Sequence, residues 1–250
     1  MAFYFDRAGV LRLREWDRYS WLIHGWGTRR RPDPSPARTP ALTLRQIHSA
    51  IVRVAGDGGV KGDALLASRP GELVGIKTAD CLPVLVADTR RRVVAAIHAG
   101  WRGMARRVVE KAVGEMRRHY GSAPGDLRAA IGPGIRACCY EVGPEVLEEF
   151  ACQFVDAARF CRGDTSNPAL IMLPRQHLTG GHALMRNLSS DRSRVDLAEA
   201  ARAQLEAAGL APARIDDSAL CTACDLERFY SYRKEKDAAG RMVAVIGLRA

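Results

Sequence analysis

The stretch from residue 73 to residue 120 constrains the fold most, because its hydrophobic pattern changes from strand-like to helical. Leu73–Lys77, Leu82–Asp88 and Val93–His98 are short aliphatic and β-branched runs bounded by Gly, Asp or Pro, as buried strands are. The next segment, Trp101–Tyr120, has an apolar residue at every fourth position: Met104, Val108, Ala112 and Met116. That spacing predicts a helix with one buried face, which follows directly on a strand.

The rest of the chain repeats this alternation. Strands are predicted at Leu42–Val54, Leu127–Ile131 and Met242–Leu248, and helices at Pro144–Phe154 and Asp196–Ala208. Strands and helices that alternate along a chain of this size indicate an α/β fold built in layers.

Several residues mark the ends of the predicted helices. Gly121 and Gly209 are expected to end the helices that precede them, since glycine accepts the left-handed conformation found there. Asp196 is a plausible N-cap, and Glu199 three residues later completes the pattern of a capping box.

The 250 residues could form one large domain or two small ones. We find no internal repeat and no acceptable interdomain linker. Residues 29–40, with four prolines, are expected to form an exposed loop, because proline is excluded from helix interiors and central strands. This loop is short and close to the N-terminus, so we expect a single catalytic domain over residues 1–250.

Composition narrows the setting in which the chain works. It has no apolar run long enough to cross a bilayer and no signal peptide, so we expect a cytoplasmic protein without a membrane partner. Its seven cysteines are then expected to be free thiols or metal ligands. The formal net charge of +10 comes mostly from dispersed arginines. No nucleic-acid-binding motif accompanies the charge, so nucleic acid is not the expected partner. The charge fits a solvated arginine-rich surface, and it also fits an anionic substrate such as phosphate.

Two histidines and one cysteine occupy unusual positions. His48 lies within an apolar, strand-like pattern, His98 ends a strand just before a glycine turn, and Cys81 lies between two strand-like runs beside an acid. Alone, each has an ordinary structural explanation, such as a buried thiol acting as a small apolar side chain. Together they could hold Zn²⁺ through three protein ligands, with the fourth position open for catalysis. No local spacing rule applies over gaps this long.

Charged residues beside these three suggest further roles. Arg45 and Arg102 could hold phosphate or developing negative charge through a bidentate guanidinium, or could form surface ion pairs. Asp80 could orient a ligand or act as a general base. It could equally be a turn residue.

Four other cysteines form two pairs. Cys221 and Cys224 make a C-x-x-C motif, to which a structural zinc would require two more ligands. Cys138 and Cys139 could supply them but are distant in sequence. A redox pair would need a setting at a helix N-terminus that the sequence does not show, so we expect buried thiols.

Motifs spread over the chain resemble those of a known family. Arg45–His48, Gly62–Leu65, Thr78–Val84 and His98–Gly103 occur in that order. They are followed by Ile131–Pro133, Cys138–Gly143, Cys221–Cys224 and Phe229–Arg233. The set is similar to the YfiH-like family, which is labelled laccase domain or polyphenol oxidase and described as purine nucleoside phosphorylases.

The resemblance implies a fold, a metal and an activity. The fold is a single layered α/β/β/α domain with mixed sheets, distantly like the catalytic domain of cytotoxic necrotizing factor. The metal is Zn²⁺ held by His48, Cys81 and His98. The activities are phosphorolysis of adenosine, inosine and methylthioadenosine, which uses phosphate, and deamination of adenosine. Another implied activity is hydrolysis of a peptidoglycan precursor. Apart from the resemblance, Tyr140 and Glu141 lie near two Gly-Pro turns and could line the pocket, where the aromatic ring could stack on a purine.

Three alternatives remain at this stage. Cys81 could be the nucleophile of a metal-free hydrolase, with His98 as its base and Asp80 or another group as the orienting residue. A polyphenol oxidase would use copper, but a blue-copper centre alone takes two His and one Cys, and a multicopper enzyme adds a His-rich cluster that six scattered histidines do not suggest. The third alternative is a non-catalytic, basic nucleotide- or RNA-binding protein.

Overall fold

Two six-stranded mixed sheets pack face to face in the computed structural model, which describes residues 2–56, 58–162 and 193–250. The first sheet has the strand order β1 (Phe3–Phe5), β2 (Leu11–Leu13), β3 (Leu22–Trp26), β14 (Met242–Leu248), β7 (Leu73–Thr78), β4 (Leu42–Thr43). The second has the order β13 (Ile215–Asp217), β10 (Leu127–Ile131), β8 (Leu82–Asp88), β9 (Val93–Ala99), β6 (Ala64–Ala67), β5 (Val52–Val54). A short pair, β11 (Cys161–Arg162) and β12 (Arg194–Val195), lies apart from both.

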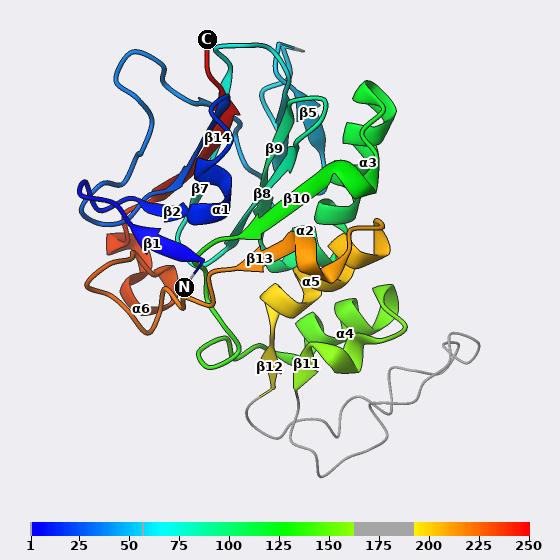
Figure 1. Cartoon of the computed structure of the whole chain (residues 1–250). Helices are drawn as coiled ribbons and strands as arrows, with labels where there is room; N and C mark the ends of the chain where they lie inside the picture. The colour runs from blue at the N-terminus through cyan, green and yellow to red at the C-terminus, as the bar shows by residue number, and fades with distance from the viewer. Residues whose placement is uncertain (1, 57, 163–192) are drawn as a thin grey trace.

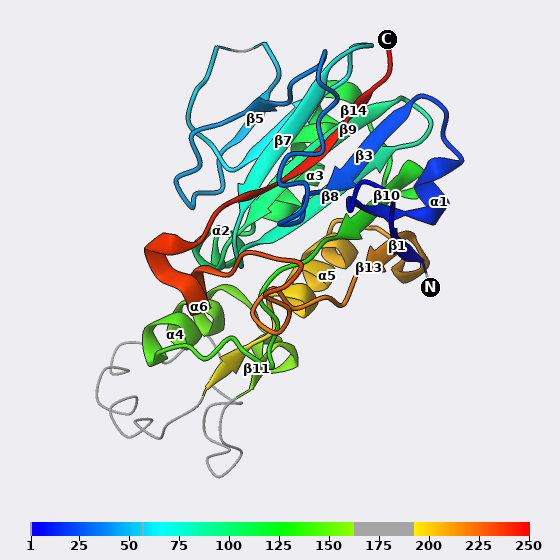
Figure 2. The ribbon, with the colours of Figure 1, turned by 90° about the vertical axis from the view of Figure 1, so that its left-hand side faces the viewer.

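Helices cover the outer face of the second sheet (Figure 1). They are α2 (Trp101–Ala105), α3 (Val108–Tyr120) and α5 (Leu197–Ala207), with α4 (Pro144–Gln153) beside α2. The other helices within the described residues are short: α1 (Arg14–Asp17), α6 (Tyr232–Glu235), and 3₁₀ turns at Pro124–Asp126, Ala157–Arg159, Pro212–Arg214 and Lys236–Ala238. Seen from the side of the first sheet, α2 and α6 both lie toward the lower end of the sheets (Figure 2).

Strand alternation divides the core into two layers. In β8, Val84 and Val86 point toward the helices, whereas Leu85 and Ala87 point between the sheets, and all four are almost completely buried. This is the period-two alternation of a strand, here apolar on both faces because each face is covered. The expected layered α/β fold with mixed sheets is confirmed.

The β8–β9 hairpin is the central element of the second sheet. Its register pairs Leu82 with Ala99 and Pro83 with His98, so the start of β8 lies beside the end of β9. At the other end, the buried Asp88 carboxylate accepts the backbone N–H groups of Arg90 and Arg91 and closes the turn. The predicted strands are confirmed here, and β9 extends one residue further, to Ala99.

The long helix predicted over Trp101–Tyr120 is wrong in one respect, because it is interrupted. Helix α2 ends at Ala105, and α3 begins at Val108 after Arg107, which adopts a left-handed conformation with φ 62°. The predicted apolar stripe survives the interruption: Met104, Val108, Ala112 and Met116 are all fully buried. The four apolar residues are therefore buried on two successive helices and not on one continuous helix.

The strand predicted over Leu42–Val54 is also wrong as a single element. Only β4 and β5 are extended, and they belong to different sheets, each parallel to its neighbour. The chain between them crosses from the first sheet to the second. His48 lies in this crossing with φ 55°, a conformation that no strand allows.

Most of the other predicted boundaries hold. Gly121 ends α3 in a left-handed conformation, and Gly209 follows α5 with φ 95°. The Asp196 carboxylate caps α5 by accepting the N–H groups of Ala198 and Glu199. Glu199 itself pairs with Arg159.

Residues 29–40 contain no helix or strand and are mostly exposed, although Pro34 and Ser35 are buried. Within the described ranges, no helix combines the length and the apolar character that crossing a membrane requires.

Gln204 stabilises the interruption between α2 and α3. Its fully buried side-chain oxygen accepts the N–H groups of Val109 and Glu110, and its amide nitrogen donates to the carbonyl of Met104. These backbone groups belong to helix ends, which have no partner inside the helix. One side chain from α5 therefore satisfies both ends of the interruption.

Replacing this amide should destabilise the protein although the volume is kept. For Gln204→Leu we expect the free energy of unfolding to fall by about 2–4 kcal/mol, because buried backbone groups lose their partners. Urea unfolding measures it. Lys111→Ala, at an exposed position of α3, is the control and should change stability by about 0.5 kcal/mol or less. Equal stability of the Gln204 variant and the wild type would contradict this role.

Candidate metal centre

The structure brings His48, Cys81 and His98 together. Their ligand atoms all lie within 4.8 Å of one another, and the Cys81 sulfur is 4.0 Å from His48 Nε2. The two imidazole rings meet edge to face with their centroids 4.9 Å apart. His98 is buried, Cys81 half-buried and His48 exposed, so the group opens to solvent on the His48 side.

The hairpin register places two of the three residues. Cys81 immediately precedes β8 and His98 lies near the end of β9, so strand pairing sets them side by side. Gly100 follows on the same edge. A Cβ at that position would lie 3.0 Å from the Cys81 sulfur and 3.0 Å from His48 Cδ2. A side chain there would press on both groups, so glycine leaves the sulfur and the imidazole in place.

Asp63 places the third residue. It is fully buried just before β6, and its carboxylate accepts the backbone N–H groups of Ile47, His48 and Ser49 and the Ser49 hydroxyl. The same carboxylate lies 2.8 Å from His98 Nδ1. One buried side chain therefore fixes the loop that carries His48 and orients the ring of His98.

Charge and hydrogen bonding couple the pKa values of Cys81, His98 and Asp63. Burial raises the pKa of Cys81, but the charge of His98 and bonding to both histidines outweigh it and lower that pKa to about 6. Burial lowers the pKa of His98, but Cys81 and Asp63 raise it to about 9. The pKa of Asp63 is held at about 2, against burial, by His98 and Ser49. Without metal, the favoured state is a thiolate beside an imidazolium.

The donor set fits zinc. Zn–S bonds of about 2.3 Å and Zn–N bonds of about 2.0 Å in a tetrahedron separate sulfur and nitrogen by about 3.5 Å, within half an ångström of the 4.0 Å between Cys81 and His48. Asp63 bonds to Nδ1 of His98, which leaves Nε2 as the ligand atom. A carboxylate behind a ligand histidine is the usual support in zinc sites. His48, Cys81 and His98 would hold the metal and leave one position open.

Asp80 is placed as an anchor between chain segments. Its backbone has φ 84°. Its carboxylate accepts a hydrogen bond from the Thr222 hydroxyl at 2.7 Å and one from the backbone N–H of Arg233 at 2.6 Å. Both oxygens are thus engaged with protein groups in a buried position. This arrangement favours the turn and positioning roles over that of a general base.

Three arginines lie in segments that carry or adjoin residues of the site. Arg102 is exposed at the start of α2 and stacks on Trp101, with 4.3 Å between the guanidinium carbon and the ring centroid. Arg45 is exposed in the crossing segment, where its backbone pairs with Lys61. Arg233 was not predicted to take part, yet its guanidinium lies 5.3 Å from the centre of the Tyr140 ring.

Tyr140 lies close to the ligands, as the sequence suggested. It is buried, and burial together with the charge of Cys81 raises its pKa well above the usual range, so it remains a neutral phenol. The positive charges of Arg233 and Arg102 act to lower the pKa of Tyr140, but they do not outweigh burial. Glu141, the next residue, is exposed, and its carbonyl accepts from Arg233.

Two residues of the site escaped prediction from sequence alone. Asp63 and Arg233 lie in segments that carry the family resemblance, but neither received a role. The signal for Asp63 was a carboxylate at the entry to a fully apolar strand, Ala64–Ala67. Such a residue must be neutralised or hydrogen-bonded to be buried there.

The prediction for the remaining cysteine pairs is wrong. Cys138 and Cys224 are exposed and Cys139 is half-buried, so only Cys221 is a buried thiol. The four sulfur atoms also lie within 4.8 Å of one another, although the pairs are far apart in sequence.

Comparisons with known proteins identify similar sequences. A family model described as multi-copper polyphenol oxidoreductase laccase matches residues 34–249. A Deinococcus radiodurans protein named purine nucleoside phosphorylase is 38% identical over 207 residues, which are 82% of this chain and 69% of that protein. A protein of an unknown prokaryotic organism, named adenosine deaminase RL5, is 34% identical over 179 residues, 72% of this chain and 59% of that protein.

The fold is shared with a solved structure. The crystal structure of YlmD from Geobacillus stearothermophilus aligns with a TM-score of 0.75 and 26% identity, covering 100% of this chain and 99% of that one.

Removing the charge of Asp63 should weaken metal binding. For Asp63→Asn we expect zinc affinity to fall about 10- to 100-fold, because His98 loses its carboxylate partner and the His48 loop loses its anchor. Competition with a chromogenic chelator measures the affinity. Asp88→Asn is the matched control, since it removes another fully buried carboxylate at the far end of β8 and should leave zinc affinity unchanged. Equal zinc affinity in the Asp63 variant and the wild type would refute this role.

Proposed function

This chain belongs to the YfiH-like family of laccase-domain proteins, and on that premise we propose that it is a zinc-dependent purine nucleoside phosphorylase. Its proposed substrates are phosphate and adenosine, inosine or methylthioadenosine, with adenosine deamination as a possible second reaction. The observation that carries the proposal is the convergence of His48, Cys81 and His98 on one point, with Asp63 behind them. The names of the two relatives support the choice of nucleosides.

The ligand set supports zinc over copper. Two imidazoles, one thiolate and an open position match catalytic zinc sites, whereas a multicopper oxidase needs a further His-rich cluster. The two other histidines within the described residues lie elsewhere. His24 is buried with its Nε2 accepting the Leu13 N–H, and His119 on α3 pairs with Glu115.

The surrounding side chains suit an anion and an aromatic base. When bound, zinc would supply a Lewis acid that stabilises negative charge on an oxygen of the reacting groups. Arg102 and Arg233 would hold phosphate, since guanidinium groups bind phosphate oxygens in pairs. Tyr140, kept neutral by burial, would contact the purine through its ring. A cytoplasmic location would keep Cys81 reduced.

One specific observation favours a second candidate, a cysteine hydrolase of amide bonds such as those in peptidoglycan precursors. Cys81 interacts with His98, and His98 in turn bonds to Asp63. These contacts match the nucleophile, base and orienting acid of a catalytic triad. The orienting acid would be Asp63 and not Asp80, whose carboxylate contacts Thr222 and Arg233.

The decisive assay compares the wild type with Cys81→Ala. In the wild type we expect adenine to be released from adenosine only when phosphate is present. This activity should be lost when a chelator removes the metal, and Zn²⁺ should restore it. In Cys81→Ala the rate should fall at least about 100-fold, because a metal ligand is lost. Liquid chromatography of the products measures adenine and inosine separately.

Iodoacetamide separates the two candidates. With zinc bound, Cys81 should be protected, and after chelation it should react with an apparent pKa near 6. Activity that survives chelation but is abolished by iodoacetamide would reject the zinc enzyme in favour of the hydrolase. Adenosine turnover independent of phosphate, yielding inosine, would reject phosphorolysis of adenosine and leave the deaminase.

A further inference from the structure

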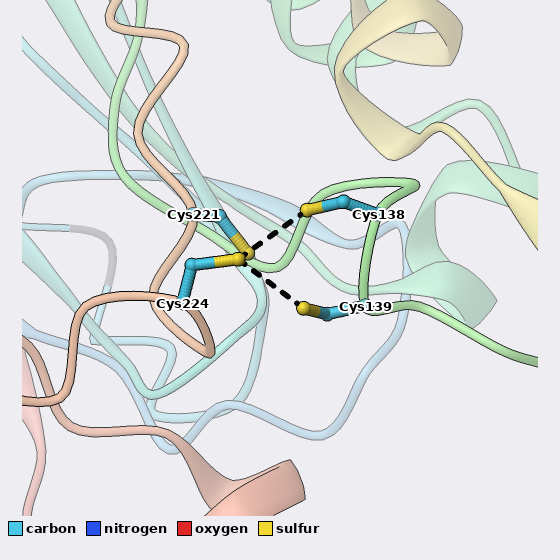
Figure 3. A group of neighbouring side chains, drawn as sticks. All are labelled: Cys138, Cys139, Cys221 and Cys224. Carbon is cyan, nitrogen blue, oxygen red and sulfur yellow. Dashed lines mark hydrogen bonds between the residues drawn. The ribbon is translucent and has the colours of Figure 1, made fainter.

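Four cysteines from two distant segments converge away from the centre described above. Cys138 and Cys139 lie in the loop between β10 and α4, and Cys221 and Cys224 lie in the loop after β13. The side chains point toward one another from the two loops (Figure 3). The Cys224 sulfur is 3.6 Å from that of Cys138 and 3.3 Å from that of Cys139, and all four sulfur atoms lie within 4.8 Å.

These separations match a tetrahedral metal site. With Zn–S bonds of about 2.3 Å, the sulfur atoms of a tetrathiolate centre lie about 3.8 Å apart. Cys224 approaches two sulfur atoms at once. A single disulfide would engage only one of them, whereas coordination to a shared ion engages all four. Soft thiolate ligands in this number select zinc or iron, and a closed set of four is typical of structural zinc.

The two loops are already held together by other contacts. Gly134 bridges to Cys221, and its N–H donates to the Leu220 carbonyl. The Arg136 guanidinium donates to both oxygens of Asp217, at 2.9 and 2.7 Å, and to the Leu220 carbonyl. Parallel pairing of β10 with β13 sets this register. The cysteine pairs are therefore presented to each other by a preformed scaffold.

The same loops carry residues of the first site. Tyr140 directly follows Cys139, and Thr222, which directly follows Cys221, donates to Asp80 beside Cys81. Fixing the cysteines would thus fix the wall of the first site without touching its ligands. We propose that Cys138, Cys139, Cys221 and Cys224 bind a second, structural Zn²⁺ that locks the 132–140 and 218–224 loops around the first centre. The four sulfur atoms carry this inference by themselves, so it does not rest on the nucleoside activity proposed above.

The test counts metal per chain in protein purified under reducing, oxygen-free conditions. Mass spectrometry should find two zinc ions in the wild type, one in Cys224→Ser and one in Cys81→Ala. Cys152→Ser, at an exposed cysteine on α4 outside both groups, is the matched control and should retain two. Circular dichroism establishes that each variant is folded.

Cobalt identifies the ligands even if a cysteine variant folds poorly. Cys81→Ala loaded with Co²⁺ should bind one ion and show the strong near-ultraviolet charge-transfer absorption of a tetrathiolate. One zinc in the wild type and none in Cys81→Ala would overturn the second site, as would iron in place of zinc. A disulfide of Cys224 in the reduced preparation would also overturn it. Such a bond would lower the mass of the wild-type chain by two hydrogen atoms and would be mapped by peptide analysis. Loss of activity with two metals still bound would count against the proposed function only.

Discussion

The buried carboxylate of Asp63 holds the centre of this protein together. It accepts three backbone N–H groups from the crossing segment, the Ser49 hydroxyl and the ring of His98, while fully shielded from water. A buried carboxylate without partners would be strongly destabilising, and each hydrogen bond to a charged group contributes about 1.5–3 kcal/mol. The loop and the carboxylate therefore require each other.

The position of Asp63 follows from the sheets. Strand β6 pairs with β9 so that Ala64 faces Ile97, which sets Asp63 beside His98. Hairpin β8–β9 sets His98 beside Cys81. The crossing from β4 in the first sheet to β5 in the second brings His48 over the same edge. Two strand pairings and one crossing segment thus converge on one point, and the glycine at position 100 leaves room for the ligands.

The sequence predicted the elements whose signals are local. The strands 82–88 and 93–98, the buried stripe of 101–120 and the cap of α5 all depend on neighbouring residues, and the structure has them. The three ligands could be named only through the family motifs, because gaps of 33 and 17 residues follow no local spacing rule. The crossing at 44–51 was missed because a side chain distant in sequence, that of Asp63, captures its backbone. The interruption at Arg107 depends on Gln204, about a hundred residues away. The cysteine cluster depends on the pairing of β10 with β13.

Anomalous diffraction from crystals of the purified protein, recorded above and below the zinc absorption edge, shows directly whether zinc lies between His48, Cys81 and His98. We expect an anomalous peak about 2.0–2.3 Å from His48 Nε2, Cys81 Sγ and His98 Nε2, with Asp63 bonded to the other nitrogen of His98. Metal-free electron density at these three side chains, in crystals grown with zinc present, would contradict it.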